Sequence, residues 1–491
     1  MRQLLRSLSL GGFLLLVACG TGPGAGSLLA PLADQTTLVD EPLVVPLGIA
    51  GVDLEAEAYD PDDILQVGPV LEEANGQLAL RLIPRSLVTG EAQITVKERN
   101  GSAGESFLFR VVPPYRSVAQ EFDLTWDPGA DQLLSTVDLD GDTLAIGTPY
   151  SASEGVDDSG AVYVYRFGAG GWELEQKLFA ADLPEEHSFG AAVDVSGDLL
   201  IVGATRDHDV ASNAGAAYIF ERQADGWKQI TKLLPPAAAG TYQGFGRAVA
   251  IAGDLAVVGA PRADSDGLTD NGQVHVYRRL NSISWVPQAI LHPSDAMSED
   301  QFGDGVATDG TTVAAVVPGV FGLSHGRALG VAYLFEPVAG TWQQIARLTP
   351  IEPQAESFGA TVRIEGDTVV VGAPHRSIVD RDGEFPGAIY VFERSGEEFN
   401  KVTKLVTGSE GADSLGARLA LAGDYILASI VEDEEPYLHL YKRHQGRWAL
   451  VNAMAAADLG ASEVGSIDLS ADHAVVAATL GDGRAYLHLP R

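Results

Sequence analysis

A repeat of 56 to 57 residues runs through most of the chain and constrains its fold more than any other feature. Each unit begins with a hydrophobic residue followed by glycine, and the first and last copies are degenerate. A unit of this length cannot bury its own apolar face, so successive copies must pack against one another. The seven units begin at Leu133-Leu134, Phe189-Gly190, Phe245-Gly246, Phe302-Gly303, Phe358-Gly359, Leu415-Gly416 and Glu463-Val464.

Each unit contains the signals of four short strands. A Gly-Asp turn such as Gly197-Asp198 follows the start of the unit, and glycine there supplies the positive φ of a tight hairpin. An apolar run such as 199–204 comes next and predicts a strand covered on both faces. An alternating strand and a strand that opens with an aromatic residue complete the unit. Four antiparallel strands make one blade of a β-propeller.

The last unit stops after its third strand, and the missing strand is found at the front of the repeats. Residues 118–122 lie 56 residues before 174–178 and share their pattern. We therefore predict that this early strand completes the last blade near residue 487 and closes the ring. Closure removes an open sheet edge that would otherwise favour aggregation.

The Phe-Gly pairs and the Gly-Ala-Pro segments at 259–261 and 372–374 resemble FG-GAP repeats. Over residues 114–491 the chain is similar to the propeller of integrin α-subunits and its bacterial relatives. The resemblance implies adhesion or protein–protein recognition, often dependent on a cation. The expected fold is all-β: a seven-bladed β-propeller preceded by a small β-sandwich domain.

The first residues are typical of an export signal. Residues 1–18 have a basic start and a short apolar core, too short to span a membrane. The segment 16–19 resembles the lipobox of bacterial lipoproteins, which implies that Cys19, the single cysteine, is lipidated. An ordinary signal peptide with an incidental cysteine is the alternative. Residues 19–33 are predicted to be a flexible tether, and Gly20 favours the outer over the inner membrane.

Residues 34–113 contain alternating strands such as 78–82 and 92–96, bounded by turns. This pattern resembles the cadherin-like and immunoglobulin-like modules of bacterial surface proteins. We expect a β-sandwich that acts as a spacer.

The chain carries 67 acidic and 32 basic residues, a formal net charge of −35. A field of that sign repels nucleic acids and anionic lipids, so contact with a membrane is expected through the lipid anchor alone. It suits cations, basic protein surfaces or neutral glycans, although an acidic surface also simply keeps an exported protein soluble. The protein is expected to be a monomer.

Two loops between the second and third strands place hard oxygen ligands around a glycine turn, which is the chemistry that Ca²⁺ prefers. A solvated acidic loop is the alternative for both. The candidate ligands are Asp264, Asp266, Asp270, Asp380, Asp382 and Glu384. No other cofactor is expected.

The loops between strands two and three, together with the connections into each new unit, are predicted to emerge on one face. Loops of variable length on a repeated scaffold are where recognition is usually found. The candidate ligand-face residues are Asp157, Asp158, Arg206, Asp207, Arg262, His375 and Arg376.

Signatures of an enzyme are not found: the histidines have no metal-ligand spacing, and there is no nucleophile elbow or phosphate-binding loop. We therefore predict a non-enzymatic, lipid-anchored envelope protein that binds a protein or a glycan. A periplasmic scaffold for envelope assembly is one alternative. A hydrolase with a central acidic pocket is another, and a channel of convergent carboxyl groups with shifted pKa values would favour it.

Overall fold

The computed structural model divides the chain into two compact units, Met1–Pro114 and Tyr115–Arg491. No helix in the described part of the chain is both long and apolar enough to cross a bilayer. The structure describes residues 35–38, 43–47, 54–59, 69–74, 77–82, 90–98, 104–112, 120–123, 136–151, 159–168, 171–182, 187–236, 240–319, 330–350, 357–374, 387–407, 412–432, 435–444, 446–459, 464–470, 474–477 and 484–487.

The first unit contains two β-sheets. One has the strand order β1-β7-β6-β3 and the other β2-β5-β4. Leu80, Leu82, Ile94 and Val96 are buried, as the alternating pattern requires. That the two sheets form an immunoglobulin-like sandwich is not shown. The strands are β1 (Gln35–Leu38), β2 (Leu43–Pro46), β3 (Leu54–Tyr59), β4 (Val70–Ala74), β5 (Gln77–Leu82), β6 (Gly90–Glu98) and β7 (Gly104–Val112).

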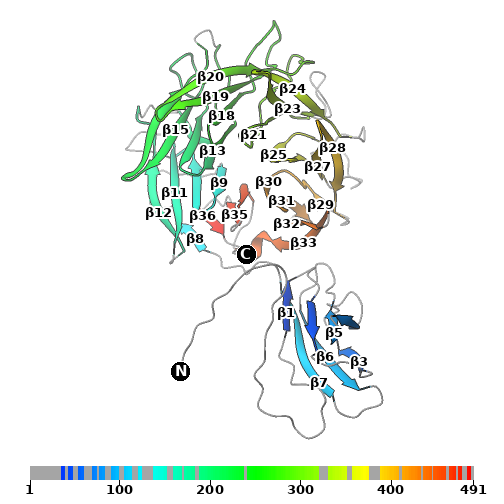
Figure 1. Cartoon of the computed structure of the whole chain (residues 1–491). Coiled ribbons are helices and arrows are strands. Elements are labelled where there is room, and N and C mark those ends of the chain that lie inside the picture. Colours follow the sequence, from blue (N-terminus) through cyan, green and yellow to red (C-terminus); the bar gives the residue numbers. More distant parts are fainter. Residues whose placement is uncertain are drawn as a thin grey trace. The chain divides into compact units, whose positions relative to one another are not determined.

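In the second unit, antiparallel sheets follow one another around a ring (Figure 1). The first three full sheets in chain order consist of β9 (Thr136–Asp140), β10 (Thr143–Thr148), β11 (Ala161–Gly168) and β12 (Gly171–Leu178); β13 (Phe189–Ser196), β14 (Leu199–Ala204), β15 (Ala216–Gln223) and β16 (Gly226–Leu233); and β17 (Val249–Ala252), β18 (Leu255–Ala260), β19 (Gln273–Asn281) and β20 (Ser284–Leu291).

The next two sheets have the same order. They consist of β21 (Val306–Thr308), β22 (Val313–Val317), β23 (Val331–Val338) and β24 (Thr341–Leu348), and of β25 (Thr361–Glu365), β26 (Thr368–Ala373), β27 (Ala388–Ser395) and β28 (Glu398–Leu405). We number the blades one to five in this order.

The prediction of seven four-stranded blades is wrong in the sheet that spans residues 412–455. Six sheets of this unit have four strands, whereas this sheet, blade six, has five. The additional strand β29 pairs with the end of β31, so that Ala412 lies opposite Glu432. Its strands are β29 (Ala412–Asp413), β30 (Leu419–Ala422), β31 (Tyr425–Glu432), β32 (Glu435–His444) and β33 (Arg447–Ala455), followed by the 3₁₀ helix η1 (Ala456–Leu459).

The fifth strand has a physical reason. Blades one to five have a loop between strands two and three, but in blade six β31 and β32 stay paired up to Glu432 and Glu435. β31 therefore extends beyond β30, which ends its pairing at Leu419 and Ala428. The extra length of β31 would be an unpaired edge, and β29 covers it.

The remaining four-stranded sheet joins both ends of the repeat region. It contains β34 (Ser466–Leu469), β35 (Ala474–Ala477), β36 (Arg484–Leu487) and β8 (Gln120–Asp123). β8 pairs antiparallel with β36, with Gln120 opposite Leu487, which is the closing strand that the repeat pattern predicted. The innermost strands contact one another in sequence, and β34 contacts β9. The ring of inner strands is therefore continuous.

The core lies between neighbouring sheets. All six residues of β14 are buried, as the apolar run of the second strand predicted. Ile201 and Ile219 of blade two pack in one cluster with Val258 and Tyr277 of blade three. Each blade thus covers the face that its neighbour exposes, which is why one repeat alone could not fold.

The Phe-Gly pairs fix the contact between blades. Phe245 is fully buried and Gly246 has a φ of 85°. A Cβ atom on Gly203 of blade two would lie 2.0 Å from the carbonyl oxygen of Gly246. Glycine is therefore required at both positions, one for the left-handed backbone and the other for close approach.

Candidate functional site: the loop face and the central channel

The loops between strands two and three and the connections between blades lie on one face, which we call the loop face. The N–H of Tyr242, in the connection from blade two to blade three, donates to the carbonyl of Ser212 at 2.9 Å. The N–H of Glu299, in the next connection, donates to the carbonyl of Thr269 at 2.8 Å. These hydrogen bonds join both kinds of connection at the same end of the blades.

A tyrosine on strand three and a cation on strand four lie side by side near the loop face in several blades. In blade four, the hydroxyl of Tyr333 donates to Asp295 at 2.7 Å and Nε of Arg347 lies 3.0 Å from the same carboxylate. Asp295 belongs to the connection from blade three. The arrangement therefore fastens an incoming connection to its blade.

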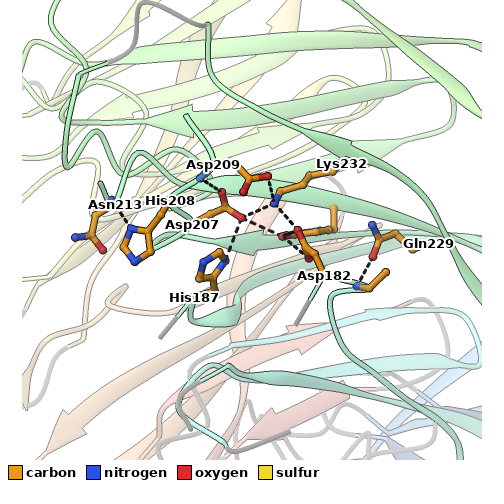
Figure 2. A network of polar contacts seen from close by, with 10 residues as sticks. Asp182, His187, Asp207, His208, Asp209, Asn213, Gln229 and Lys232 are labelled. Atoms are coloured by element: carbon orange, nitrogen blue, oxygen red, sulfur yellow. Dashed lines mark hydrogen bonds and ion pairs between the residues drawn. The ribbon is translucent and has the colours of Figure 1, made fainter. Parts of the chain in front are cut away.

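Blade two elaborates this arrangement into a charge network around one buried carboxylate (Figure 2). Nζ of Lys232 lies 2.6 Å from Asp182, 2.6 Å from Asp207 and 2.8 Å from Asp209. The side chain of Asp207 is completely buried. The equivalent residue is Ser151 in blade one and Ala263 in blade three, so these two neighbouring blades lack the carboxylate.

Asp207 also contacts two other polar groups. Nδ1 of His187 lies 3.1 Å from its Oδ2, and the hydroxyl of Tyr218 donates to the same oxygen at 3.1 Å. Burial alone would raise the pKa of Asp207, but His187, Lys232 and the N–H of Asp209 together hold it well below its usual range. Burial would likewise lower the pKa of Lys232, yet its three carboxylate partners raise it.

The three carboxylates of this network form the one group in the described part of the chain that could hold a metal ion. Their oxygens converge on the Lys232 ammonium group, as Figure 2 shows. The cation that balances Asp207 is thus supplied by the protein itself.

The structure places the predicted metal ligands of blade three in a tight turn. Oδ1 of Asp264 accepts the N–H of Asp270 at 2.8 Å. Asp266 and Gly267 both have positive φ angles, which form the turn between Ser265 and Leu268. Binding of Ca²⁺ by Asp264, Asp266 and Asp270 stays a prediction. Asp380, Asp382 and Glu384 lie outside the described residues, as does Cys19.

Of the predicted ligand-face residues, Arg206, Asp207 and Arg262 are described. Arg206 and Arg262 are exposed at equivalent positions of blades two and three, whereas Asp207 is buried and stabilises its loop from inside. Asp157, Asp158, His375 and Arg376 lie outside the described residues.

Two tyrosine side chains that the sequence analysis did not single out, Tyr150 and Tyr242, are exposed on the loop face. The guanidinium of Arg206 lies over the ring of Tyr150, 5.9 Å from its centroid. Tyr242 is 58% exposed and has a φ of 59°, which is uncommon for a bulky residue. We call Tyr150, Arg206 and Tyr242 the aromatic patch. A comparison of these positions across the repeats would have identified the residues, but it would not have shown that their side chains are exposed.

The inner strands enclose a central channel with a cavity of about 540 Å³. Six carboxyl groups and two guanidinium groups belong to its lining residues: Asp138, Asp140, Asp194, Asp304, Glu365, Asp468, Arg247 and Arg363. Asp468, Asp138 and Asp194 stand at the same position of three consecutive inner strands. The other inner strands carry Ala250, Ala307, Arg363 and Ala420 there.

Each of the three aspartates bridges two blades. Oδ2 of Asp138 accepts the N–H of Val195 at 2.6 Å, and Oδ2 of Asp194 accepts the N–H of Ile251 at 2.6 Å. Oδ2 of Asp468 accepts the N–H of Leu139 at 2.7 Å. An inner-strand N–H that faces the channel has no ladder partner, so these carboxylates satisfy it.

The channel shifts the pKa values of these aspartates upward. Burial, followed by the charges of Asp194 and Asp468, raises the pKa of Asp138 well above its usual value. Burial raises the pKa of Asp194 to about 7 and that of Asp468 to about 6, although Arg363 opposes both shifts. The sequence analysis named such a channel as the feature that would favour a hydrolase, so that alternative stays open.

Sequence reasoning missed this cluster. Asp138 stands close to Asp140 and Asp142 in the sequence, and the sequence analysis did not single it out. Asp194 stands five residues after Phe189, and the same offset leads to Arg363 from Phe358. A comparison of this position across the repeats would have signalled a polar ring.

Comparison with protein families supports the repeat assignment. The FG-GAP repeat model matches residues 172–220, 227–277, 285–335 and 342–392. The chain therefore contains FG-GAP repeats within a β-propeller, an architecture that indicates a protein-binding scaffold. No curated protein matches the sequence significantly.

Among solved structures, the chain is similar to the β-propeller domain of the Trilobed protease from Pyrococcus furiosus, with 9% identity, a TM-score of 0.42 and coverage of 73% of this chain and 95% of that one. For Chaetomium thermophilum Sqt1 the identity is 13%, the TM-score 0.41 and the coverage 70% and 76%. For a quinoprotein alcohol dehydrogenase-like protein from Bacteroides thetaiotaomicron the identity is 12% and the TM-score 0.33, and the match covers 87% of this chain and 94% of that one.

Proposed function

We propose that this FG-GAP propeller binds a protein partner through the loop face of blades one to three. The aromatic patch is the observation that carries the proposal. Tyrosine and arginine dominate the binding energy of protein interfaces because they combine a large apolar area with hydrogen-bonding groups. The side chains of Tyr150, Arg206 and Tyr242 are exposed on the loop face rather than packed in the core, and Arg206 lies over the ring of Tyr150.

The charge network around the buried Asp207 supports the proposal because it fixes the loop that carries Arg206. The carbonyl of Asp207 accepts the N–H of Gly215 at 3.1 Å, while its carboxylate is bound by Lys232 and Tyr218. The loop is thus closed at its base and fastened from within. A rigid loop loses little conformational entropy when a partner binds, which raises affinity.

The export signal and the lipobox-like segment support a location at the cell envelope. Lipidation of Cys19 would hold the propeller at the cell envelope, where the partner is another envelope protein. A Cys19→Ala chain should then leave the membrane fraction and appear in the soluble fraction. Adhesion through a glycan, or assembly of envelope components in the periplasm, would use the same face.

The binding experiment compares two exposed sites of similar character at opposite ends of the blades. The variant Tyr150→Ala/Arg206→Ala/Tyr242→Ala removes the aromatic patch. The matched control, Leu280→Ala/Ile283→Ala, alters exposed apolar side chains on the hairpin between β19 and β20, far from the loop face. Each full-length chain is cross-linked in the cells that produce it, and its partners are quantified by mass spectrometry.

We expect at least one partner whose yield falls about tenfold or more with the patch variant, since two or three interface anchors are lost. The control should retain that partner. Equal recovery with both variants, or loss with the control alone, would contradict binding through the loop face.

A further inference from the structure

The residues that line the central channel carry more carboxyl groups than guanidinium groups. For Asp138 and Asp194, the hydrogen bonds within the described part of the chain involve Oδ2, so that Oδ1 of each has no donor there. Both residues line the 540 Å³ cavity. Oδ1 of each residue can therefore accept a hydrogen bond from a ligand in the cavity.

Arg363 lines the same cavity, and its charge acts on Asp138, Asp194 and Asp468 without an ion-pair contact. Its hydrogen bond runs from Nη1 to the carbonyl of its neighbour Val362, at 3.0 Å. It forms no ion pair with any residue that the structure describes. Arg363 belongs to the inner strand of blade five, whereas Asp468, Asp138 and Asp194 belong to the last blade and to blades one and two. The cavity thus has three aspartates on neighbouring inner strands and Arg363 on another strand, in addition to the ion pair of Arg247 with Asp304.

The spacing of the carboxyl groups excludes a single metal ion as the natural occupant. A metal ion needs its ligand oxygens close together, and among the described residues only Asp182, Asp207 and Asp209 satisfy this condition. The channel aspartates bridge separate blade junctions and do not form such a group. An organic cation, whose N–H groups point in several directions, reaches separated carboxylates better.

We propose that the central channel binds a small zwitterion, with its ammonium group on Asp138 and Asp194 and its carboxylate on Arg363. The cavity volume lies in the range of small-molecule sites, roughly 300–1,000 Å³. Charge-assisted hydrogen bonds would replace the missing donors of Oδ1 and give Arg363 a carboxylate partner. The proposal concerns a different surface from the loop face and does not depend on it.

The protonation of the channel gives binding a characteristic pH dependence. The charged groups that line the cavity are Asp138, Asp140, Asp194, Asp304, Glu365, Asp468, Arg247 and Arg363. Because burial raises the pKa of Asp194 to about 7 and of Asp468 to about 6, protons compete with the ammonium group below neutrality. Affinity should therefore rise about tenfold between pH 5 and pH 8.

The test is isothermal titration calorimetry with the full chain at pH 8 and low salt. Glycine and 4-aminobutyrate represent free amino acids of increasing charge separation, and triglycine represents a short peptide. Ethylamine and acetate carry one charge each. We expect at least one zwitterion to bind with a Kd below about 1 mM, and both single-charge probes to bind about tenfold or more weakly.

Variants then assign the contacts. Asp138→Asn/Asp194→Asn retains acceptors for the blade-bridging N–H groups, and Arg363→Gln retains a polar side chain. Each should weaken the best zwitterion about tenfold or more, while Asp225→Asn, an exposed acidic residue of the β15–β16 turn, should not. Circular dichroism checks that all variants fold.

Two outcomes would overturn the proposal: no zwitterion of the series binds, or the best one binds the folded aspartate and arginine variants as tightly as the unaltered chain. Binding of ethylamine as strong as that of the zwitterions would also contradict it.

Discussion

The charge network at the loop face of blade two and the central channel both remove aspartates from bulk water, yet their electrostatics are opposite. Asp207 has the Lys232 ammonium group 2.6 Å away, and its pKa lies well below the usual range. Asp138 and Asp194 have backbone N–H donors but no cation in contact, and their pKa values are raised. Burial is therefore common to both places, and the nearby counter-charge decides the direction of the shift.

This difference separates two roles. A buried carboxylate that has its own cation stabilises the structure. Removal of the cation alone leaves an uncompensated buried charge. A buried carboxylate without one is destabilising when ionised and is available for a proton or a cationic ligand. In blade two the counter-charge stabilises the loop that carries Arg206, whereas the channel carboxyl groups can still take up protons. Three predictions test this comparison.

The largest effect is expected when Lys232 is lost. Lys232→Met leaves Asp207 buried without its cation and should lower the free energy of unfolding by about 3 kcal/mol. The matched variant is Arg347→Met in blade four, whose partner Asp295 is 41% exposed, and it should cost less than about 1 kcal/mol. Urea denaturation at pH 7.5 measures both. Equal losses for the two variants would show that burial of the partner does not matter.

A smaller effect of opposite sign is expected in the channel. The folded chain holds extra protons between about pH 4 and pH 7, because the pKa of Asp194 is raised to about 7 and that of Asp468 to about 6. Their stabilising contribution is complete below the unfolded pKa and is lost as the pH rises through these values.

The free energy of unfolding should therefore fall between pH 5 and pH 8. Asp138→Asn/Asp194→Asn should raise it by about 2 kcal/mol at pH 8 and leave it unchanged at pH 5, since the protonated acid and the amide are both neutral. Denaturation at the two pH values decides the matter, with Asp225→Asn as the control. A loss of stability at pH 8 would contradict the prediction.

The smallest effect is expected for Arg363→Gln. Arg363 lowers the pKa of Asp194 and of Asp468, so its removal should raise both values further. The free energy of unfolding should fall by about 1 kcal/mol at pH 8 and not at pH 5. In the background of the two asparagine substitutions, the loss should shrink, because the coupled charges are gone. An undiminished loss would assign Arg363 a packing role instead.

The fold could be predicted to a large extent because its information is local and repeated. The apolar runs, the Gly-Asp turns and the Phe-Gly pairs each specify one strand or junction, and the length of 56 to 57 residues identifies one blade. The closing strand β8 was also predictable, since its pattern matches the fourth strands. The five-stranded sheet was not, because it depends on which edge β29 reaches in space.

The candidate site was predictable only in part. The loops of the loop face are visible as segments of variable length, and Arg206, Asp207 and Arg262 were among the candidates. Nothing local distinguishes the exposed Arg206 from the buried Asp207 beside it, since Lys232 and His187 are supplied by β16 and by the preceding connection.

The sequence by itself determined the repeat, the strands of each blade and the strand that closes the ring, because hydrophobic period and turn chemistry act over a few residues. Only the tertiary structure decided which charges meet. Asp468, Asp138 and Asp194 are brought to one cavity by ring closure, and Arg363 reaches it from another blade. Electrostatic interactions depend on distance in space, and that distance exists only after the blades have assembled.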